Sequence, residues 1–282
     1  MCSSDLEAHD PIGNLKKVED KVVLFRSDTG APLGVVSDGY KVVQPKEVLE
    51  FFRNWADAGG VTIESAGVLF GGKRYFATAK LSDAVSVDGG RDKVVPYVLL
   101  STSADGSLAT EARWTTVRVV CNNTLRMASK GSADFKVSHR SVFKAEEARN
   151  LIEVAHADFH FFMATARTLA NIKVNAQKAE DLTVKLLTKS SEEVARESAA
   201  FGRIMALFNG DGKGSNFETA HDTAWGWLNA VTEYVDHHVR ARSDENRQAS
   251  ALWGPGDALK AKALDLVTRS EEHTSELQSP CN

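Results

Sequence analysis

The arrangement of apolar and polar positions divides the chain into a strand-rich first half and a helix-rich second half. Up to about residue 140, short apolar runs alternate with turns rich in glycine, proline and aspartate, which is typical of β-strands. From about residue 144, apolar residues recur every three or four positions, which is typical of amphipathic helices. This order predicts an α+β fold, with an antiparallel sheet and one flanking helix in the N-terminal part and a helical C-terminal region.

The first half begins with an irregular polar stretch at residues 7–21, which a short meander follows, with strands at residues 21–25, 33–37 and 40–43. A helix is predicted from about Lys46 to Ala58, because Pro45 suits the first position of a helix and Gly59-Gly60 suits its end. Two hairpins and a brief last strand complete this half. Short loops make their strands antiparallel neighbours, and the expected strands cover residues 61–70, 73–81, 94–103, 112–121 and 135–140.

The second half begins with a long helix, predicted from about Lys144 to Ile172, that carries one apolar stripe. Further helices are predicted at residues 176–188, 191–208 and 217–242, and a last one begins near Gly256. The segment NGDGKGSN between two of these helices is predicted to be a flexible loop.

Both ends of the chain carry segments that look foreign to it. Residues 269–279, RSEEHTSELQS, look like a translated sequencing adapter, and residues 1–6, MCSSDL, look like the same kind of adapter. We therefore expect residues 1–6 and 269–282 to be artefacts that flank a fragment. Between them we expect a sheet domain at residues 22–142 and a helical region at residues 143–268.

Charge and cysteine content narrow the possible functions. The two suspect ends hold four acidic residues and one basic residue, so without them the formal net charge of −4 becomes −1. Such a chain needs a local basic patch in order to bind nucleic acid. Only Cys121 lies between the ends, which excludes a disulfide framework. Without a secretory signal or an apolar run of membrane-spanning length, we expect a cytoplasmic protein with no membrane partner.

The basic residues gather between Arg113 and Lys144. Seven arginines and lysines in this segment stand against one acid, Asp134, which gives the segment a net charge of +6. Cations on strands and turns contact phosphate oxygens, and an aromatic ring can stack on an unpaired base. The sequence therefore predicts a nucleic-acid site, with single-stranded DNA favoured, at Arg113, Trp114, Arg118, Asn122, Asn123, Arg126, Lys130, Lys136, His139 and Arg140.

A purely structural interpretation of these residues remains open. Basic strands often solvate a sheet face or pair with acids from elsewhere in the chain. The run Asn122–Thr124 also suits a turn and an N-cap for a short helix at residues 125–129. Cys121 suits a buried apolar position better than a nucleophile.

A second constellation, on two of the predicted helices, would resemble a carboxylate–histidine metal site across a bundle. Its members are Glu153, His156, His160, Glu233, His237 and His238. Most of them lie beside the apolar stripes and not within them, which favours a solvated flank. We therefore predict no metal, no cofactor and no catalytic residue, and we keep a metal-dependent enzyme only as an alternative.

Four segments resemble a phage- and plasmid-associated family, the domain of unknown function 932. They are YKVVQPKEVLEFF, AGVLFGGKRYF, VVCNNTLRMA and TAWGWLNAVTEYVDHHVRAR, and the resemblance covers most of residues 22–268. It implies a role in phage or plasmid biology but no particular activity. Members of that family tend to have a His-Thr pair where this chain has His139-Arg140, so a role for that hydroxyl is not carried over.

The sequence therefore predicts a mobile-element protein that binds nucleic acid during recombination or replication. A helix, a basic antiparallel meander and a long helix are also similar in order to phage single-strand annealing proteins, which is an analogy of fold only. The main alternative is a helical interaction module that acts on host or phage proteins through the amphipathic segment around Trp225. The sequence is compatible with a homo-oligomer as well as with a monomer.

Overall fold

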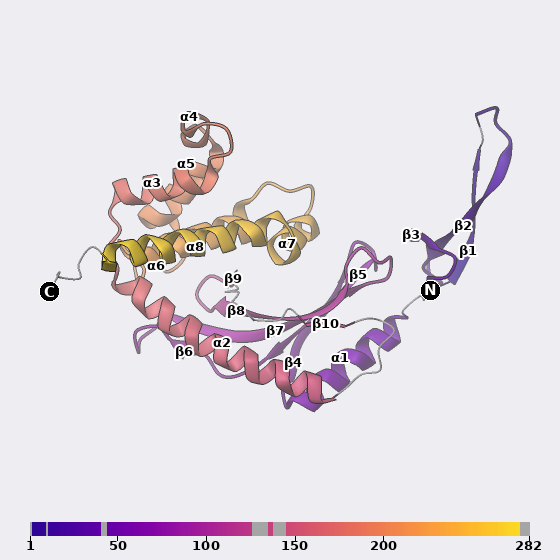
Figure 1. The fold of residues 1–282 in the computed structure, drawn as a ribbon, viewed down its shortest axis with the longest axis horizontal. Coiled ribbons are helices and arrows are strands. Elements are labelled where there is room, and N and C mark those ends of the chain that lie inside the picture. The colour runs from indigo at the N-terminus through magenta and orange to yellow at the C-terminus, as the bar shows by residue number, and fades with distance from the viewer. Residues whose placement is uncertain (1, 10, 41–43, 126–134, 138–144, 277–282) are drawn as a thin grey trace. The chain divides into compact units, whose positions relative to one another are not determined.

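The computed structural model describes residues 2–9, 11–40, 44–125, 135–137 and 145–276. It confirms the α+β fold, with antiparallel sheets in the first half and helices in the second (Figure 1). The contacts within the chain divide it into two compact units. The strand unit comprises Met1–Leu81, Tyr97–Trp114 and Ala133–Val154, and the helical unit comprises Ser82–Pro96, Thr115–Ser132 and Ala155–Asn282.

A three-stranded antiparallel sheet opens the strand unit, in the order β1 (Cys2–His9), β2 (Leu15–Phe25) and β3 (Pro32–Ser37). Leu24 and Leu33 are buried on it. The expectation of an irregular stretch at residues 7–21 is wrong, because β2 begins at Leu15 and its exposed polar residues pair with β1. Of the strand expected at residues 40–43, Tyr40 is not in a strand and the other three residues lie outside the described part.

Helix α1 (Pro45–Gly59) confirms the helix that Pro45 and the two glycines predicted, and Gly60 ends it with a left-handed φ of 68°. Its buried side chains include Val48, Phe52 and Trp55, and it packs on β4 and β5 (Figure 1). Among the described residues the main sheet has the order β10-β8-β7-β5-β4, with β6 beside β7 and β9 beside β8. Its strands are β4 (Thr62–Leu69), β5 (Arg74–Lys80), β6 (Val85–Ser86), β7 (Lys93–Ser103), β8 (Thr110–Arg118), β9 (Asn123–Leu125) and β10 (Phe135–Val137).

Strand β5 shows how the two faces of this sheet differ in the strand unit. Tyr75, Ala77 and Ala79 are buried, and Tyr75 shares a pocket with Pro45 at the start of α1, so this is the face that α1 covers. The alternate residues Arg74, Phe76, Thr78 and Lys80 are half-buried on the other face. The period of two therefore separates an apolar side from a side that carries basic and aromatic groups.

The long helix is confirmed as α2 (Ala145–Asn171), and its residues from Ala155 onward belong to the helical unit. The other helices of that unit are α3 (Ala176–Leu187), α4 (Glu192–Arg196), α5 (Ala199–Ala206), α6 (Ala224–Glu233), α7 (Asp244–Trp253) and α8 (Pro255–Glu276). Two π-helical turns, η1 (Leu207–Asp211) and η2 (Tyr234–His238), extend α5 and α6. In the described part of the chain, no helix combines the length and apolar character needed to cross a membrane.

Helix boundaries differ from the expectation where a hydroxyl caps a helix. The single helix expected at residues 191–208 is two helices, because Ser191 and Ser198 each accept a backbone N–H at a helix start. The helix expected from residue 217 begins only at Ala224, where Thr223 is the cap. Helix α7, capped by Ser243, was not predicted.

Candidate functional site

In the helical unit, the segment between Thr115 and Leu125 is a hairpin of β8 and β9. Thr116 pairs with Leu125, and Arg118 pairs with Asn123. Asn122 occupies the turn with a φ of 54°, a conformation that asparagine tolerates better than most residues. The short helix expected at residues 125–129 does not begin at Leu125, because Leu125 is in the strand and its carbonyl accepts the Thr116 hydroxyl at 2.8 Å. Residues 126–129 lie outside the described part of the chain.

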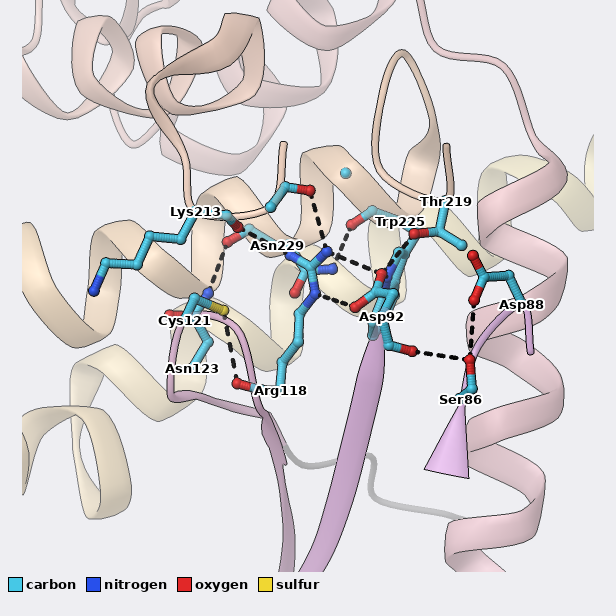
Figure 2. Close-up of polar contacts among 12 residues, drawn as sticks. Ser86, Asp88, Asp92, Arg118, Cys121, Asn123, Lys213, Thr219, Trp225 and Asn229 are labelled. Carbon is cyan, nitrogen blue, oxygen red and sulfur yellow. Dashed lines mark hydrogen bonds and ion pairs between the residues drawn. The ribbon is translucent and has the colours of Figure 1, made fainter. Parts of the chain in front are cut away.

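Arg118 stands at the centre of a buried polar network (Figure 2). Arg118 is 3% exposed and Asp92 is 0% exposed. The Nε of Arg118 donates to Asp92 Oδ1 at 2.7 Å, and Nη2 donates to Asp92 Oδ2 at 2.9 Å. The same guanidinium donates to the carbonyls of Lys213 and Gly214, each at 3.4 Å. The charge predicted to contact phosphate is therefore directed into the helical unit.

The carboxylate of Asp92 joins three distant parts of the helical unit. Besides Arg118, its Oδ2 accepts the Thr219 hydroxyl at 2.6 Å and the Trp225 indole N–H at 2.9 Å (Figure 2). The carboxylate thus accepts four hydrogen bonds, one at Oδ1 and three at Oδ2, and this offsets the cost of burying it. Trp225, which the interaction-module alternative placed on a binding face, is 2% exposed and belongs to the core. The loop around Lys213 and Gly214 is held by hydrogen bonds, although the sequence predicted flexibility there.

The polar residues of β9 also point inward. Asn123 is 2% exposed, and its Nδ2 donates to the Asn229 carbonyl at 3.3 Å and to Thr232 Oγ1 at 3.2 Å. Thr124 donates to Asp236 Oδ2 through its backbone N–H at 2.6 Å and through its hydroxyl at 3.0 Å. Lys260, which is 2% exposed, bridges Asp236 Oδ1 at 2.8 Å and Thr124 Oγ1 at 2.7 Å. These bonds dock β9 on α6, η2 and α8.

Cys121 is a buried free thiol in the turn that precedes β9. Burial raises its pKa to about 11, although Arg118 acts in the opposite direction. A thiol with this pKa carries almost no thiolate at neutral pH, and the thiolate is the nucleophilic form. The environment of Cys121 therefore supports the structural interpretation.

The strand unit carries Arg113 on one side of its main sheet, which we call the polar sheet face, and Ser101, Ser103 and Glu111 are buried on it. Its members project from one side of β5, β7 and β8, and they are Arg74, Phe76, Thr78, Lys80, Ser101, Ser103, Glu111 and Arg113. Phe76 pairs with Ser101, and the Ser101 hydroxyl donates to Glu111 Oε1 at 3.3 Å. Arg113 Nε lies 3.1 Å from Glu111 Oε1. One row of contacts thus crosses three neighbouring strands.

Of the remaining residues predicted for the nucleic-acid site, some lie in the described part of the chain and others lie outside it. Trp114, adjacent in sequence to Arg113, is 5% exposed, so its ring is buried and does not present a free stacking surface. Lys136 lies in β10, and its backbone pairs with Glu111 at the edge of the sheet. The other predicted contacts lie outside the described residues, and they are Arg126, Lys130, His139 and Arg140. The alternation in KRYFATAK was the signal for Arg74, Phe76 and Lys80, which were not predicted as site residues.

Two residues of the histidine–carboxylate constellation, Glu233 and His238, lie near each other and contact other polar groups. Glu233 is 5% exposed and its Oε2 accepts the Lys213 backbone N–H at 3.0 Å. His238 Nε2 lies 3.9 Å from Glu233 Oε1 and 3.3 Å from Arg203 Nη2. Burial, followed by the charge of Arg203, lowers the pKa of His238. Over the described residues, no three histidine, cysteine, aspartate or glutamate side chains form a group able to hold a metal ion.

Antiparallel sheets followed by a helical region define an α+β protein, and the comparison with known families agrees with the resemblance seen in the sequence. Residues 32–253 match the family described as Domain of unknown function (DUF932), and the chain belongs to that family. Neither the curated proteins nor the solved structures gave a match.

Proposed function

We propose that this protein binds single-stranded nucleic acid and that the polar sheet face of the strand unit makes the contact. The observation that carries the proposal is the alternation of β5, which leaves Arg74, Phe76 and Lys80 half-buried on the side of the sheet away from α1. Single strands expose the flat faces of their bases, and proteins bind them with aromatic rings between basic groups. In this proposal Phe76 takes the stacking role that the sequence gave to Trp114.

Part of the basic segment, strand β10, pairs at the edge of the main sheet. Residues 126–144 contain five basic residues and one acid, a net charge of +4, and β10 lies within them. Because β10 pairs with β8, it brings part of this segment beside Glu111 and Arg113. Each neutralised phosphate releases counterions, so such a segment adds affinity without base specificity.

The carboxylates near this face have partners that reduce their repulsion of phosphate. Glu111 is 2% exposed and contacts Ser101 and Arg113. Glu64 accepts the Tyr97 hydroxyl at 2.7 Å. Burial and this hydrogen bond raise the pKa of Tyr97 to about 12, so the phenol stays neutral at physiological pH. The cations of β5 are therefore the groups best placed to meet a nucleic-acid backbone.

Membership of the family supports the biological setting that we propose. The resemblance seen in the sequence implies an association with phages and plasmids, and single strands arise when such elements recombine and replicate. We therefore place the protein among those of mobile elements and in the cytoplasm, where such strands occur.

The test is binding of a fluorescently labelled oligothymidine, measured by anisotropy at two salt concentrations. We expect salt-dependent binding, which the double variant Arg74→Ala with Lys80→Ala weakens by about tenfold or more. It should also make the plot of log affinity against log salt less steep, reducing the size of its negative slope by about 1 to 2. Each lost phosphate contact reduces the size of the slope by about one. Phe76→Ala should weaken single-strand binding by about 1–3 kcal/mol and duplex binding less.

A matched control removes one lysine and one arginine from another part of the strand unit. Lys46 and Arg53 are exposed on α1, which covers the opposite side of the sheet. Lys46→Ala with Arg53→Ala should leave affinity and salt slope near the unmodified values. An absence of binding at low salt, or an equal loss in both double variants, contradicts the proposal.

A further inference from the structure

A pocket of about 400 Å³ lies in the strand unit, between the start of α1 and the turn that joins β2 to β3. Its lining residues are Arg26, Ser27, Asp28, Pro45, Val68, Gly72 and Tyr75. Pockets that hold small molecules measure roughly 300–1,000 Å³ and combine apolar walls with a few polar groups. Here Pro45 and Val68 supply apolar surface, and the β2–β3 turn supplies the polar groups.

Tyr75 is the buried polar group of this pocket. The residue is 7% exposed, and burial raises the pKa of its phenol, with Arg26 acting in the opposite direction. The charges of Arg26 and Asp28, which line the same pocket, act on its hydroxyl in opposite directions. Tyrosine combines an apolar ring with a polar tip, so at a pocket wall it offers both packing surface and a hydrogen-bonding group. The hydroxyl can both donate to and accept from a molecule in the pocket.

Arg26 and Asp28 form an ion pair at the polar end of the pocket, so this end has no net charge. Arg26 Nε and Nη2 donate to the two oxygens of Asp28 at 3.0 and 2.6 Å, and Nη1 donates to the Gly71 carbonyl at 3.0 Å. A guanidinium has five N–H groups, so two remain for a ligand. The Asp28 carboxylate repels a phosphate or carboxylate, and the Arg26 guanidinium repels a metal ion. A neutral molecule with both donors and acceptors on its edge fits this set best.

We propose that this pocket binds one uncharged, flat heterocycle of nucleobase size. The ring lies against Pro45 and Val68, and its edge exchanges hydrogen bonds with the Tyr75 hydroxyl and the free N–H groups of Arg26. The pocket opens on the side of the sheet that α1 covers, because Val68 pairs with Tyr75 and both project away from Phe76. The inference is therefore independent of single-strand binding by the polar sheet face.

The probes are the four ribonucleosides, with adenosine monophosphate as the charged counterpart of adenosine. Saturation-transfer difference NMR on the full chain measures the affinity for each. We expect saturable binding of at least one nucleoside, and no tighter binding of adenosine monophosphate than of adenosine. Tyr75→Phe should weaken this binding by about three- to tenfold, the loss expected for one hydrogen bond. Val68→Phe should abolish it, because Val68 is 54% exposed and a larger ring there fills the pocket without disturbing the core.

Tyr97→Phe is the matched control, since Tyr97 is a tyrosine of the same sheet on the other face and outside the pocket. It should leave nucleoside affinity unchanged, and a thermal melt of each variant confirms that it is folded. The proposal is overturned if no nucleoside binds saturably, or if folded Tyr75→Phe and Val68→Phe bind as well as the unmodified chain. It is also overturned if adenosine monophosphate binds about ten times more tightly than adenosine. The variants Arg74→Ala and Lys80→Ala should leave nucleoside binding intact, so failure here and failure of oligonucleotide binding are distinguishable.

Discussion

The carboxylate of Asp92 shows how much one residue can organise. It is fully buried and accepts hydrogen bonds from Arg118, Thr219 and Trp225, which come from three separate parts of the helical unit. Burying an ion pair costs several kcal/mol in desolvation, which good geometry and additional hydrogen bonds offset. Removal of either charge leaves the other uncompensated.

Arg118→Ala should therefore lower the free energy of unfolding by about 3–5 kcal/mol, because it leaves the Asp92 carboxylate buried without its cation. Urea denaturation followed by tryptophan fluorescence measures the change. Arg91→Ala is the control, since the guanidinium groups of Arg118 and Arg91 both lie over the Phe217 ring, 5.8 and 5.1 Å from its centre, but Arg91 is exposed. A loss below about 1 kcal/mol for Arg118→Ala would show that the network is solvated and not structural.

Residue types could be predicted from the sequence, but their environments could not. Arg118 and Trp114 belong to the types that bind nucleic acid, yet both are buried. Asp92 precedes Arg118 by 26 positions and Trp225 follows Asp92 by 133, and no local pattern joins them. The structural interpretation of Cys121 needed only the general tendency of free cysteines to be buried, and it agrees with the burial found.

At the scale of elements, β9 is a short strand that depends on its polar contacts. It has three residues, and its backbone pairs only with β8 among the described strands. Thr124, Asp236 and Lys260 join it to η2 and α8. Asp236 and Lys260 carry the two charges of this group. When one of them is removed, the other keeps a different number of hydrogen bonds in each case.

Asp236→Ala should destabilise the protein more than Lys260→Met. Without Asp236, the buried ammonium of Lys260 keeps only the Thr124 hydroxyl among its described contacts, and we expect a loss of about 3–5 kcal/mol. Without Lys260, the carboxylate still accepts two hydrogen bonds from Thr124, and we expect a loss of about 1–3 kcal/mol. Thermal and urea unfolding of both variants give the order, and the reverse order would refute this account of β9.

Elements with strong local signals could be predicted, and those defined by tertiary contacts could not. The hairpin of β4 and β5, helix α1 and helix α2 follow from glycines, Pro45 and apolar periodicity. The division between α4 and α5 depends on Ser198, and a single serine within a helical apolar pattern does not by itself mark the start of a new helix. Strand β9 pairs through residues that a single sequence reads equally well as a turn and a cap.

At the scale of the whole molecule, the two units do not follow the order of the chain. The helical unit includes Ser82–Pro96 and Thr115–Ser132, which precede its long helix by tens of residues. Both Asp92 and Arg118 lie in these early segments. A division at residue 142, which the change from strands to helices suggested, would separate α6 from the carboxylate that its Trp225 contacts.

A fragment of residues 143–268 should therefore fail to fold as it does in the full chain. It lacks Asp92, Arg118 and β9, so Trp225, Asn229 and Lys260 would lose buried partners. Residues 82–276 contain all three segments of the helical unit that the structure describes, and this longer fragment should retain a cooperative thermal transition. Near-ultraviolet circular dichroism and thermal melts compare the two, and cooperative unfolding of the shorter fragment would contradict the prediction.

The shared carboxylate of Asp92 also has a consequence for inheritance. A substitution at position 92 removes the acceptor of the donors at positions 118, 219 and 225 at the same time. A single mutation there should therefore lower fitness strongly. Descendants can leave this arrangement only through several compensating changes, or by passing through a poorly folded ancestor. In an alignment of relatives, these four columns should accordingly change as one block, even though 133 positions of chain separate the first from the last.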